Sequence, residues 1–205
     1  MMFQNWKAFK WSSLGYSLIA NNLFDATTES LWVLKHDSVI INSFSNDYQS
    51  VIVSFSINRI TLSMTFVYAF NLYIKRIHLW RNLEFISNNM CNSWILHGDF
   101  NTIFRPDEKT GSNFCRISDK EFSSCIDKCG LIEFSISGVD YTWSRYTLNG
   151  KKARKLDRCF VKMDERNDAL DIFGPTLPKF HSDHNPLLID FCVNKSRSAP
   201  LPFKF

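Results

Sequence analysis

The fold of this chain is decided by residues 94–101, WILHGDFN, where an apolar run ends at a glycine and two polar side chains follow. The run has the composition of a buried strand. Because side chains alternate between the faces of a strand, Asp99 and Asn101 are expected to point the same way, while Phe100 returns to the core. A carboxylate accepts a proton or binds a hard cation, and a nearby amide orients a water or a phosphate oxygen. The pattern fits a functional strand end and, equally well, a structural aspartate followed by a turn-capping asparagine.

Two further polar segments lie against apolar runs later in the chain, RKLDRCFV at residues 154–161 and FHSDHNPLLI at residues 180–189. They place Asp157, Asp183 and His184 at predicted strand ends. Each segment has a plainer interpretation: Asp157 as a surface ion pair with its basic neighbours, and His184 as a loop or capping histidine. With Asp99, the segments bring three carboxylates and one histidine to strand ends, and these side-chain types suit metal-assisted hydrolysis.

Length and composition indicate one globular domain. The chain has 205 residues, 45% of them hydrophobic, which is enough to bury a core. Its 24 basic and 20 acidic side chains leave a net charge of +4, which permits a nucleic-acid partner without requiring one. The six cysteines form no C-x-x-C pair and no zinc pattern, so buried, reduced thiols are expected. No apolar run approaches the roughly 20 residues needed to span a bilayer, so no membrane partner is expected.

Alternating and apolar runs separated by turn residues predict many short strands and few helices. Besides the run at 94–101, strands are expected at residues 16–20, 31–34, 39–41, 49–57, 62–70, 131–136, 141–146, 154–162 and 187–193. Helical spacing predicts a helix at 74–86, and Ser118 and Glu121 form a capping box for a second helix that ends at Gly130. Asn149-Gly150 predicts a hairpin between the strands at 141–146 and 154–162. A short helix at 166–172 is also expected. These elements suggest two packed sheets with helices outside.

Four motifs, in order and spacing, resemble the endonuclease/exonuclease/phosphatase superfamily, and most closely the endonuclease domain of plant-type non-LTR (LINE) retrotransposon polyproteins. The motifs are GDFN at 98–101, YTW at 141–143, LDR at 156–158 and SDH at 182–184. The resemblance implies a four-layer α/β sandwich of two mostly antiparallel sheets flanked by helices. We assign residues 1–193 to this domain and residues 194–205 to a linker. The resemblance also implies DNA as partner, a former fusion to a reverse transcriptase, and an intracellular, nuclear location.

Hydrolysis of a phosphodiester needs charge neutralisation, an activated water and help for the leaving group. We expect Asp99 to activate the water and Asn101 to hold that water or a phosphate oxygen. His184 is expected to donate a hydrogen bond to the phosphoryl oxygen as charge builds there. An all-oxygen carboxylate site suits Mg²⁺, with Mn²⁺ as an alternative.

The resemblance adds three residues by their place in the motifs. It implies that Asp157 orients the histidine, that Asp183 lies by the metal, and that Tyr68 contacts the phosphate. Tyr68 fits equally well as an ordinary strand aromatic. Trp143 is expected in the core rather than stacked on a base. The basic residues 151–155 fit either a contact with a DNA backbone or a solvated hairpin tip.

The resemblance fails at the beginning of the chain. Related domains carry an asparagine on an early strand and then a glutamate, the main metal ligand, and neither Asn5 nor Glu29 lies in such a context. We therefore expect an N-terminally truncated domain whose Mg²⁺ site and DNA nicking are impaired. Two other functions stay open: a non-catalytic relic with at most weak nucleic-acid binding, and a phosphatase acting on a small phosphoester.

Overall fold

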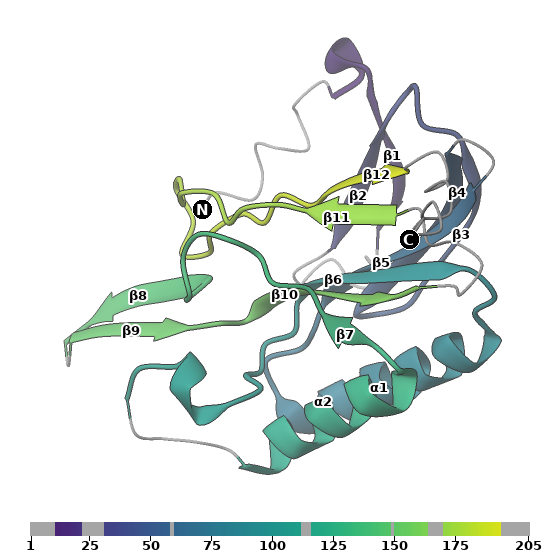
Figure 1. Ribbon diagram of the computed structural model, residues 1–205. Helices are drawn as coiled ribbons and strands as arrows, with labels where there is room; N and C mark the ends of the chain where they lie inside the picture. Colours follow the sequence, from purple (N-terminus) through teal and green to yellow (C-terminus); the bar gives the residue numbers. More distant parts are fainter. Residues whose placement is uncertain are drawn as a thin grey trace, which may run out of the picture.

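A six-stranded sheet forms the centre of the fold (Figure 1). The computed structural model describes residues 11–21, 31–57, 60–111, 116–148, 150–163 and 170–193. The sheet order is β3 (Ile41–Asn46), β4 (Ser50–Ile57), β5 (Ile60–Tyr68), β6 (Ser93–Asp99), β10 (Asp157–Lys162) and β7 (Ile132–Glu133). Strands β5 and β6 are parallel, because helix α1 (Tyr73–Asn89) carries the chain back between them. The other neighbouring strands of this sheet are antiparallel.

Two helices, α1 and α2 (Arg116–Cys129), lie side by side along one face of this sheet (Figure 1). An aromatic core fills the space between the helices and the sheet. The ring of Phe122 in α2 lies 5.1 Å from that of Trp80 in α1 and 5.0 Å from that of Phe100, measured between centroids. Phe160 of β10 completes the group and is fully buried. Large rings removed from water contribute much of the free energy that holds a helix on a sheet.

Further strands cover the other face of the central sheet or project from it. They form three antiparallel pairs: β1 (Tyr16–Asn21) with β2 (Trp32–His36), β11 (Leu170–Phe173) with β12 (Asp190–Val193), and β8 (Trp143–Thr147) with β9 (Gly150–Arg154). Val33 of β2 and Ile172 and Phe191 of the β11–β12 pair pack in one cluster with Val53 and Ile95 of the central sheet. Helices, central sheet and outer strands together confirm the predicted α/β sandwich. The β8–β9 hairpin extends away from these layers (Figure 1).

Most predicted strands, the hairpin around residue 149 and the helix at 74–86 are confirmed, but the single strand predicted at 154–162 is wrong. The chain leaves β9 after Arg154 and enters β10 at Asp157. At the break, the backbone N–H groups of Leu156 and Asp157 donate to the Thr142 hydroxyl rather than to a neighbouring strand. The predicted strand is therefore two strands that pair with different partners, β9 with β8 and β10 with β6 and β7.

Four other predictions are also wrong in detail. The strand predicted at 39–41 begins only at Ile41, as β3. Ser118 does not cap α2, because the helix already begins at Arg116 and the buried Ser118 hydroxyl accepts a hydrogen bond from Arg76 of α1 at 2.7 Å. Residues 170–172 belong to strand β11 rather than to a helix. The strand at 131–136 shrinks to the two residues of β7. The expected linker at 194–205, and residues 166–169 of the expected short helix, lie outside the described residues.

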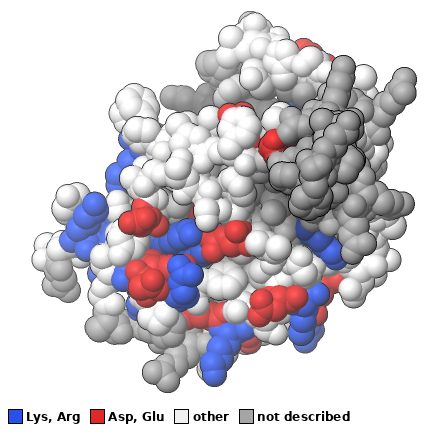
Figure 2. All heavy atoms as spheres, viewed as in Figure 1, with Lys and Arg blue, Asp and Glu red and all other residues white. Residues whose placement is uncertain are grey.

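The prediction of buried thiols is confirmed for three of the described cysteines and is wrong for two. Cys125, Cys129 and Cys159 are buried free thiols, whereas Cys91 and Cys192 are exposed and Cys115 lies outside the described residues. On the face of the molecule that Figure 2 shows, basic and acidic side chains are intermixed over the lower part, with no broad region of a single sign. Within the described ranges, no helix is long and apolar enough to cross a membrane.

Candidate active site

Three strands of the central sheet bring chemically active side chains to one edge. In the parallel pairing of β5 with β6, Tyr68 lies opposite Asp99, and in the antiparallel pairing of β10 with β6, Asp157 lies opposite Asp99. The carboxyl ends of β5 and β6 and the amino end of β10 therefore meet at the same level. Asp99 follows the apolar run of β6 and Asp157 precedes the apolar run of β10, so two carboxylates reach this edge.

Gly98 allows the backbones of β5 and β6 to meet closely just before Asp99. Its φ is +142°, and a Cβ atom on it would lie 2.0 Å from the carbonyl oxygen of Val67. A side chain at this position would force the two strands apart. The glycine in the GDFN motif thus fixes where Asp99 stands relative to β5.

Asn101 holds the Asp99 carboxylate. Its backbone N–H donates to Oδ1 of Asp99 at 2.8 Å, and its side-chain Nδ2 donates to Oδ2 at 3.2 Å and to the carbonyl oxygen of Ala69 at 2.7 Å. Asn101 adopts φ +50°, a left-handed conformation that asparagine tolerates better than most residues. Phe100 between them is fully buried, as predicted. Asn101 therefore caps the turn after the strand and, by the same hydrogen bonds, holds the Asp99 carboxylate of the candidate site.

His184 joins the two aspartates into one group. Its Nδ1 lies 2.9 Å from Oδ2 of Asp157, and its Nε2 lies 3.9 Å from Oδ2 of Asp99. We call Asp99, Asp157 and His184 the site group; each offers an atom within 4.8 Å of the others. When Nδ1 donates its hydrogen to Asp157, the ring is held with Nε2 directed toward Asp99.

The site group perturbs the acidity of its own members. Burial, and then the charge of Asp157, raise the pKa of Asp99 to about 6, although the Asn101 amide, His184 and Arg76 oppose the shift. Burial lowers the pKa of His184, but the hydrogen bond to Asp157 and the charges of the surrounding aspartates outweigh it and the pKa is raised. Asp99 thus titrates near neutral pH, as a general base should.

The remaining predicted residues lie around this group. Asp183 is not part of it: its Oδ2 accepts a hydrogen bond from the indole nitrogen of Trp143 at 2.8 Å. Trp143 is partly exposed beside Asp183, with the Arg154 guanidinium 5.7 Å from its ring centroid, so the prediction of a core tryptophan is wrong. Tyr68 is partly buried at the end of β5.

Asp157 is not the surface ion pair that its basic neighbours also suggested. Its side chain is 14% exposed and hydrogen-bonded to His184, while Lys155 pairs with Glu133 at 2.8 Å. Lys155 precedes β10, and within the strand Asp157 and Arg158 are consecutive, so their side chains leave β10 on opposite sides.

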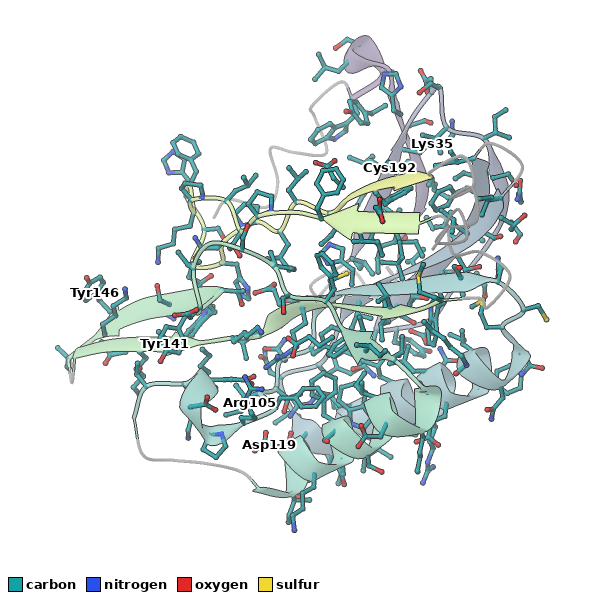
Figure 3. The ribbon with its side chains drawn as sticks, in the orientation of Figure 1. Lys35, Arg105, Asp119, Tyr141, Tyr146 and Cys192 are labelled. Atoms are coloured by element: carbon teal, nitrogen blue, oxygen red, sulfur yellow. The ribbon has the colours of Figure 1, made fainter. Side chains whose placement is uncertain are left out.

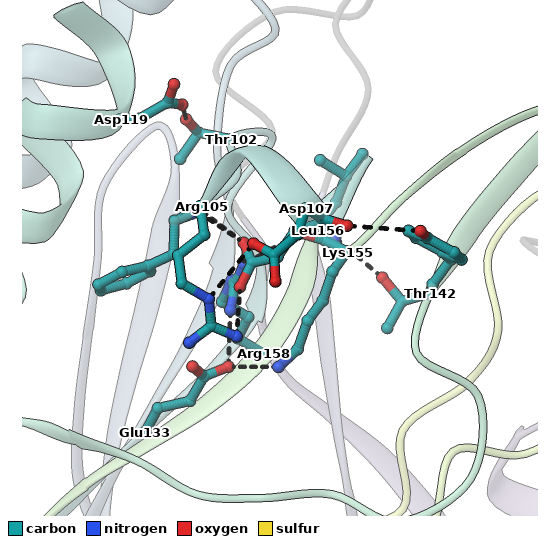
Figure 4. A network of polar contacts seen from close by, with 12 residues as sticks. Thr102, Arg105, Asp107, Asp119, Glu133, Thr142, Lys155, Leu156 and Arg158 are labelled. Carbon is teal, nitrogen blue, oxygen red and sulfur yellow. Dashed lines mark hydrogen bonds and ion pairs between the residues drawn. The ribbon is translucent and has the colours of Figure 1, made fainter. Parts of the chain in front are cut away.

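Sequence reasoning missed a second buried polar group on the far side of β10 (Figure 4). The Arg158 side chain is fully buried and forms ion pairs with Glu108 and with Glu133, the latter at 2.6 Å. Glu108 also accepts the backbone N–H groups of Phe104 and Arg105. We call Arg158, Glu108, Glu133 and Lys155 the arginine cluster. No local signal marks it, because Glu108 and Glu133 are 50 and 25 residues from Arg158 in the sequence.

The site group has the donors that a hard cation requires. It holds two carboxylates against one histidine, so negative charge exceeds positive charge unless a cation is added. Mg²⁺ binds through one or two carboxylates while retaining waters, and the partly exposed side of His184 leaves room for solvent. In the part of the chain that is described, no other group of acidic, histidine and cysteine side chains has this arrangement.

Comparison with solved structures shows which proteins share this fold. The sequence matches no protein-family model and no curated protein. The endonuclease domain of TRAS1, a telomere-specific non-LTR retrotransposon, is similar with a TM-score of 0.64 and 14% identity over 88% of this chain and 82% of that one.

Two further solved structures show the same likeness. The 3′ phosphatase NExo from Neisseria, bound to a product DNA hairpin, has a TM-score of 0.62 and 14% identity over 88% of this chain and 81% of that one. TDP2 of D. rerio, complexed with a single-strand DNA product, has a TM-score of 0.61 and 12% identity over 94% of this chain and 83% of that one. At these identities the likeness is one of fold, and the chain has the fold of the endonuclease/exonuclease/phosphatase proteins.

Proposed function

We propose that this chain is a Mg²⁺-dependent phosphodiesterase that nicks DNA, as the endonuclease domain of a LINE-type retrotransposon does. The observation that carries the proposal is the site group itself, in which His184 is hydrogen-bonded to Asp157 and directed at Asp99. These three side chains come from segments far apart in the sequence. They meet at one sheet edge in a fold shared with a retrotransposon endonuclease domain.

The chemistry divides among the residues by their contacts. Asp157 holds the His184 ring, so that Nε2 donates to a phosphoryl oxygen as negative charge builds there. Asp99 takes the proton of the attacking water, and its raised pKa makes it a stronger base than an ordinary aspartate. Asn101 keeps the Asp99 carboxylate in place. Tyr68, at the end of β5, is the remaining candidate for a phosphate contact.

Mg²⁺, when bound, neutralises phosphate charge. We assign Asp183 as its carboxylate ligand, one oxygen of which is engaged by Trp143, while the negative charge of Asp99 and Asp157 favours a cation near them. Mn²⁺ suits the same oxygen donors. The family resemblance assigns the main metal ligand to an early glutamate, and among the described residues no glutamate joins the site group. We therefore expect this chain to nick DNA more slowly than a related domain that has this glutamate. The proposal also includes an origin in a reverse-transcriptase polyprotein and a nuclear, intracellular site of action.

The β8–β9 hairpin supports DNA as the substrate. Lys151 and Lys152 are exposed on β9, and Tyr146 and Leu148 are 79% and 106% exposed near its tip. Figure 3 shows Tyr146 at the end of the hairpin, away from the packed layers. Basic side chains bind phosphates, so we propose that DNA bound at the site group also contacts this hairpin. Affinity that falls steeply with salt concentration is the expected signature.

Conversion of supercoiled plasmid to the open circle tests the proposal. The parent is expected to nick with Mg²⁺ or Mn²⁺ and not with EDTA. Asp99→Ala and His184→Ala are each expected to lower turnover by roughly 10²–10⁴-fold while DNA affinity is nearly kept. His78→Ala removes an exposed histidine of α1 and serves as the matched control. Equal nicking by Asp99→Ala, His184→Ala and the parent contradicts the assignment.

The other two functions give different results in the same experiment. A chain that binds DNA weakly and never nicks it, even with Mn²⁺, is a non-catalytic relic. A chain that hydrolyses a soluble phosphomonoester in an Asp99-dependent way, but leaves plasmid intact, is a phosphatase.

A further inference from the structure

The two halves of the Asp157–His184 pair come from different segments, and a third segment contacts both. Asp157 begins β10, whereas His184 lies in the irregular chain between β11 and β12. Residues 141–144, the YTW motif and the serine after it, run between them. The isolated bridge of Trp143 with His184 and the hydrogen bond from the Ser144 N–H to the Asp183 carbonyl oxygen, at 2.9 Å, tie this segment to the His184 side.

Thr142 is hydrogen-bonded both to the segment that carries Asp157 and to the segment that carries His184. Its Oγ1 accepts the backbone N–H of Leu156 at 3.0 Å and that of Asp157 at 2.9 Å. Its carbonyl oxygen accepts the backbone N–H of Asn185, the residue after His184, at 2.7 Å. Thr142 is 3% exposed, so water has little access to these bonds.

The chemistry of threonine suits this role. A hydroxyl oxygen has two lone pairs, and here both are used by consecutive backbone N–H groups at the break between β9 and β10. At the same break, the Lys155 N–H donates to the Glu108 carbonyl oxygen, and the Leu156 carbonyl oxygen accepts the Phe100 N–H at 3.0 Å. Several hydrogen bonds therefore fix the backbone just before β10. Thr142 links this backbone to that of the segment that carries His184.

We infer that Thr142 is a positioning residue, which couples the backbone at Asp157 to the backbone at His184 and so sets the distance between the two side chains. This inference rests on the function proposed above, because it assigns a role in the same reaction. It also explains why the YTW motif stands between the GDFN and LDR motifs without supplying a catalytic side chain. A threonine that only satisfied buried N–H groups would stabilise the fold and leave the turnover of the folded enzyme unchanged.

Two substitutions in the full chain separate these roles. Thr142→Val keeps the shape and removes the acceptor, whereas Thr142→Ser keeps the oxygen. Thr142→Val is expected to lower kcat for plasmid nicking by roughly a hundredfold with KM for DNA within about threefold of the parent, because a small misplacement of reacting groups is costly. Thr142→Ser is expected to stay within about threefold of the parent in kcat, since the hydrogen bonds can form again.

Thr65→Val is the matched control. Thr65 is another buried threonine of the structure, and its hydroxyl accepts the Trp94 indole N–H at 2.9 Å in the core. Its loss also leaves a buried N–H without its partner, so stability falls while kcat is kept. A kcat loss in Thr142→Val no larger than in Thr65→Val overturns the inference.

Amide hydrogen exchange, followed by NMR, tests the coupling without any activity. In Thr142→Val, exchange is expected to accelerate at Leu156 and Asp157, whose acceptor is gone, and also at Asn185, whose own acceptor remains. Unchanged exchange at Asn185 overturns the inference even if the chain nicks DNA. If the parent does not nick, the proposed function fails and exchange alone decides the coupling. Should Thr142→Val not fold, Thr142→Ala, in which a water can replace the hydroxyl, is measured against the same criterion.

Discussion

Asp157 and Arg158 are neighbours in β10, yet their side chains enter two buried acidic groups of opposite character. In the arginine cluster, the carboxylates of Glu108 and Glu133 surround the fully buried Arg158 guanidinium. In the site group, Asp99 and Asp157 share one histidine. One group is neutralised by the chain's own cations, and the other keeps an excess of negative charge.

The pKa values follow this difference in charge. Burial raises the pKa of Glu133, but Arg158 and Lys155 outweigh it, so the pKa is lowered. At Asp99, burial and the second carboxylate act together and raise the pKa to about 6. A buried acid that is paired by its own chain is structural, whereas one that is left without a full counter-charge is prepared for a ligand. Within β10, Arg158 therefore belongs to a group that stabilises the fold, and Asp157 belongs to the candidate active site.

Removing the cation of the arginine cluster should have the largest effect. Arg158→Met keeps most of the volume but leaves Glu108 and Glu133 without their buried partner, and the free energy of unfolding is expected to fall by about 3–5 kcal/mol. Urea denaturation measures it. Changing Glu108 as well, in Arg158→Met with Glu108→Gln, should recover part of the loss. If the free energy of unfolding of Arg158→Met falls by less than about 1 kcal/mol, the arginine cluster does not stabilise the fold as we expect.

The pH dependence of stability should show the excess charge of the site group. Because the folded state keeps the Asp99 proton up to about pH 6 and the unfolded state loses it near pH 3.8, the folded state binds more protons in this window. Stability from this group therefore falls as pH rises through the window, by about 3 kcal/mol for about two pKa units. The difference between Asp99→Asn and the parent isolates it: the advantage of the variant should grow between pH 4 and pH 6 and then level off. A difference that does not vary with pH would contradict the account.

Lys155 should contribute least. Its ion pair with Glu133 spans 2.8 Å, but its side chain is 31% exposed and solvent screens the pair. Lys155→Met is expected to cost under about 1 kcal/mol, and the cost should shrink in high salt. Thermal unfolding at low and high salt measures both. A cost equal to that of Arg158→Met would erase the distinction between the two cations.

The sequence predicted secondary structure best where the signal is local, such as an apolar run that ends at a polar residue. The strand before Asp99 follows from its apolar run, the hairpin near residue 149 from Asn149-Gly150 and the α1 helix from helical spacing, and the structure contains them all. Asp99 and Asp157 could be placed at strand ends for the same reason, and the register of β6 and β10 then brings the two aspartates to one level. The prediction of a strand end is wrong for His184, which lies in the irregular chain between β11 and β12.

What the sequence could not predict depends on partners far along the chain. The break at Leu156 is set by the hydroxyl of Thr142, and the burial of Arg158 is set by Glu108 and Glu133. Trp143 looked like a core residue, but Asp183, 40 residues later, holds its indole nitrogen at the partly exposed site. Hydrogen bonds of this kind leave no periodic pattern, so only the three-dimensional arrangement reveals them.

The stability gained from Mg²⁺ tests the central claim most directly, namely that Asp99 and its neighbours lack a cation that the arginine cluster already has. The unfolding midpoint of the parent and of Asp99→Asn is measured near pH 7.5 with Mg²⁺ and with EDTA. Mg²⁺ about tenfold above its Kd should stabilise the parent by about 1.4 kcal/mol and leave Asp99→Asn unchanged. An equal gain in both proteins, or no gain in the parent, would contradict the account.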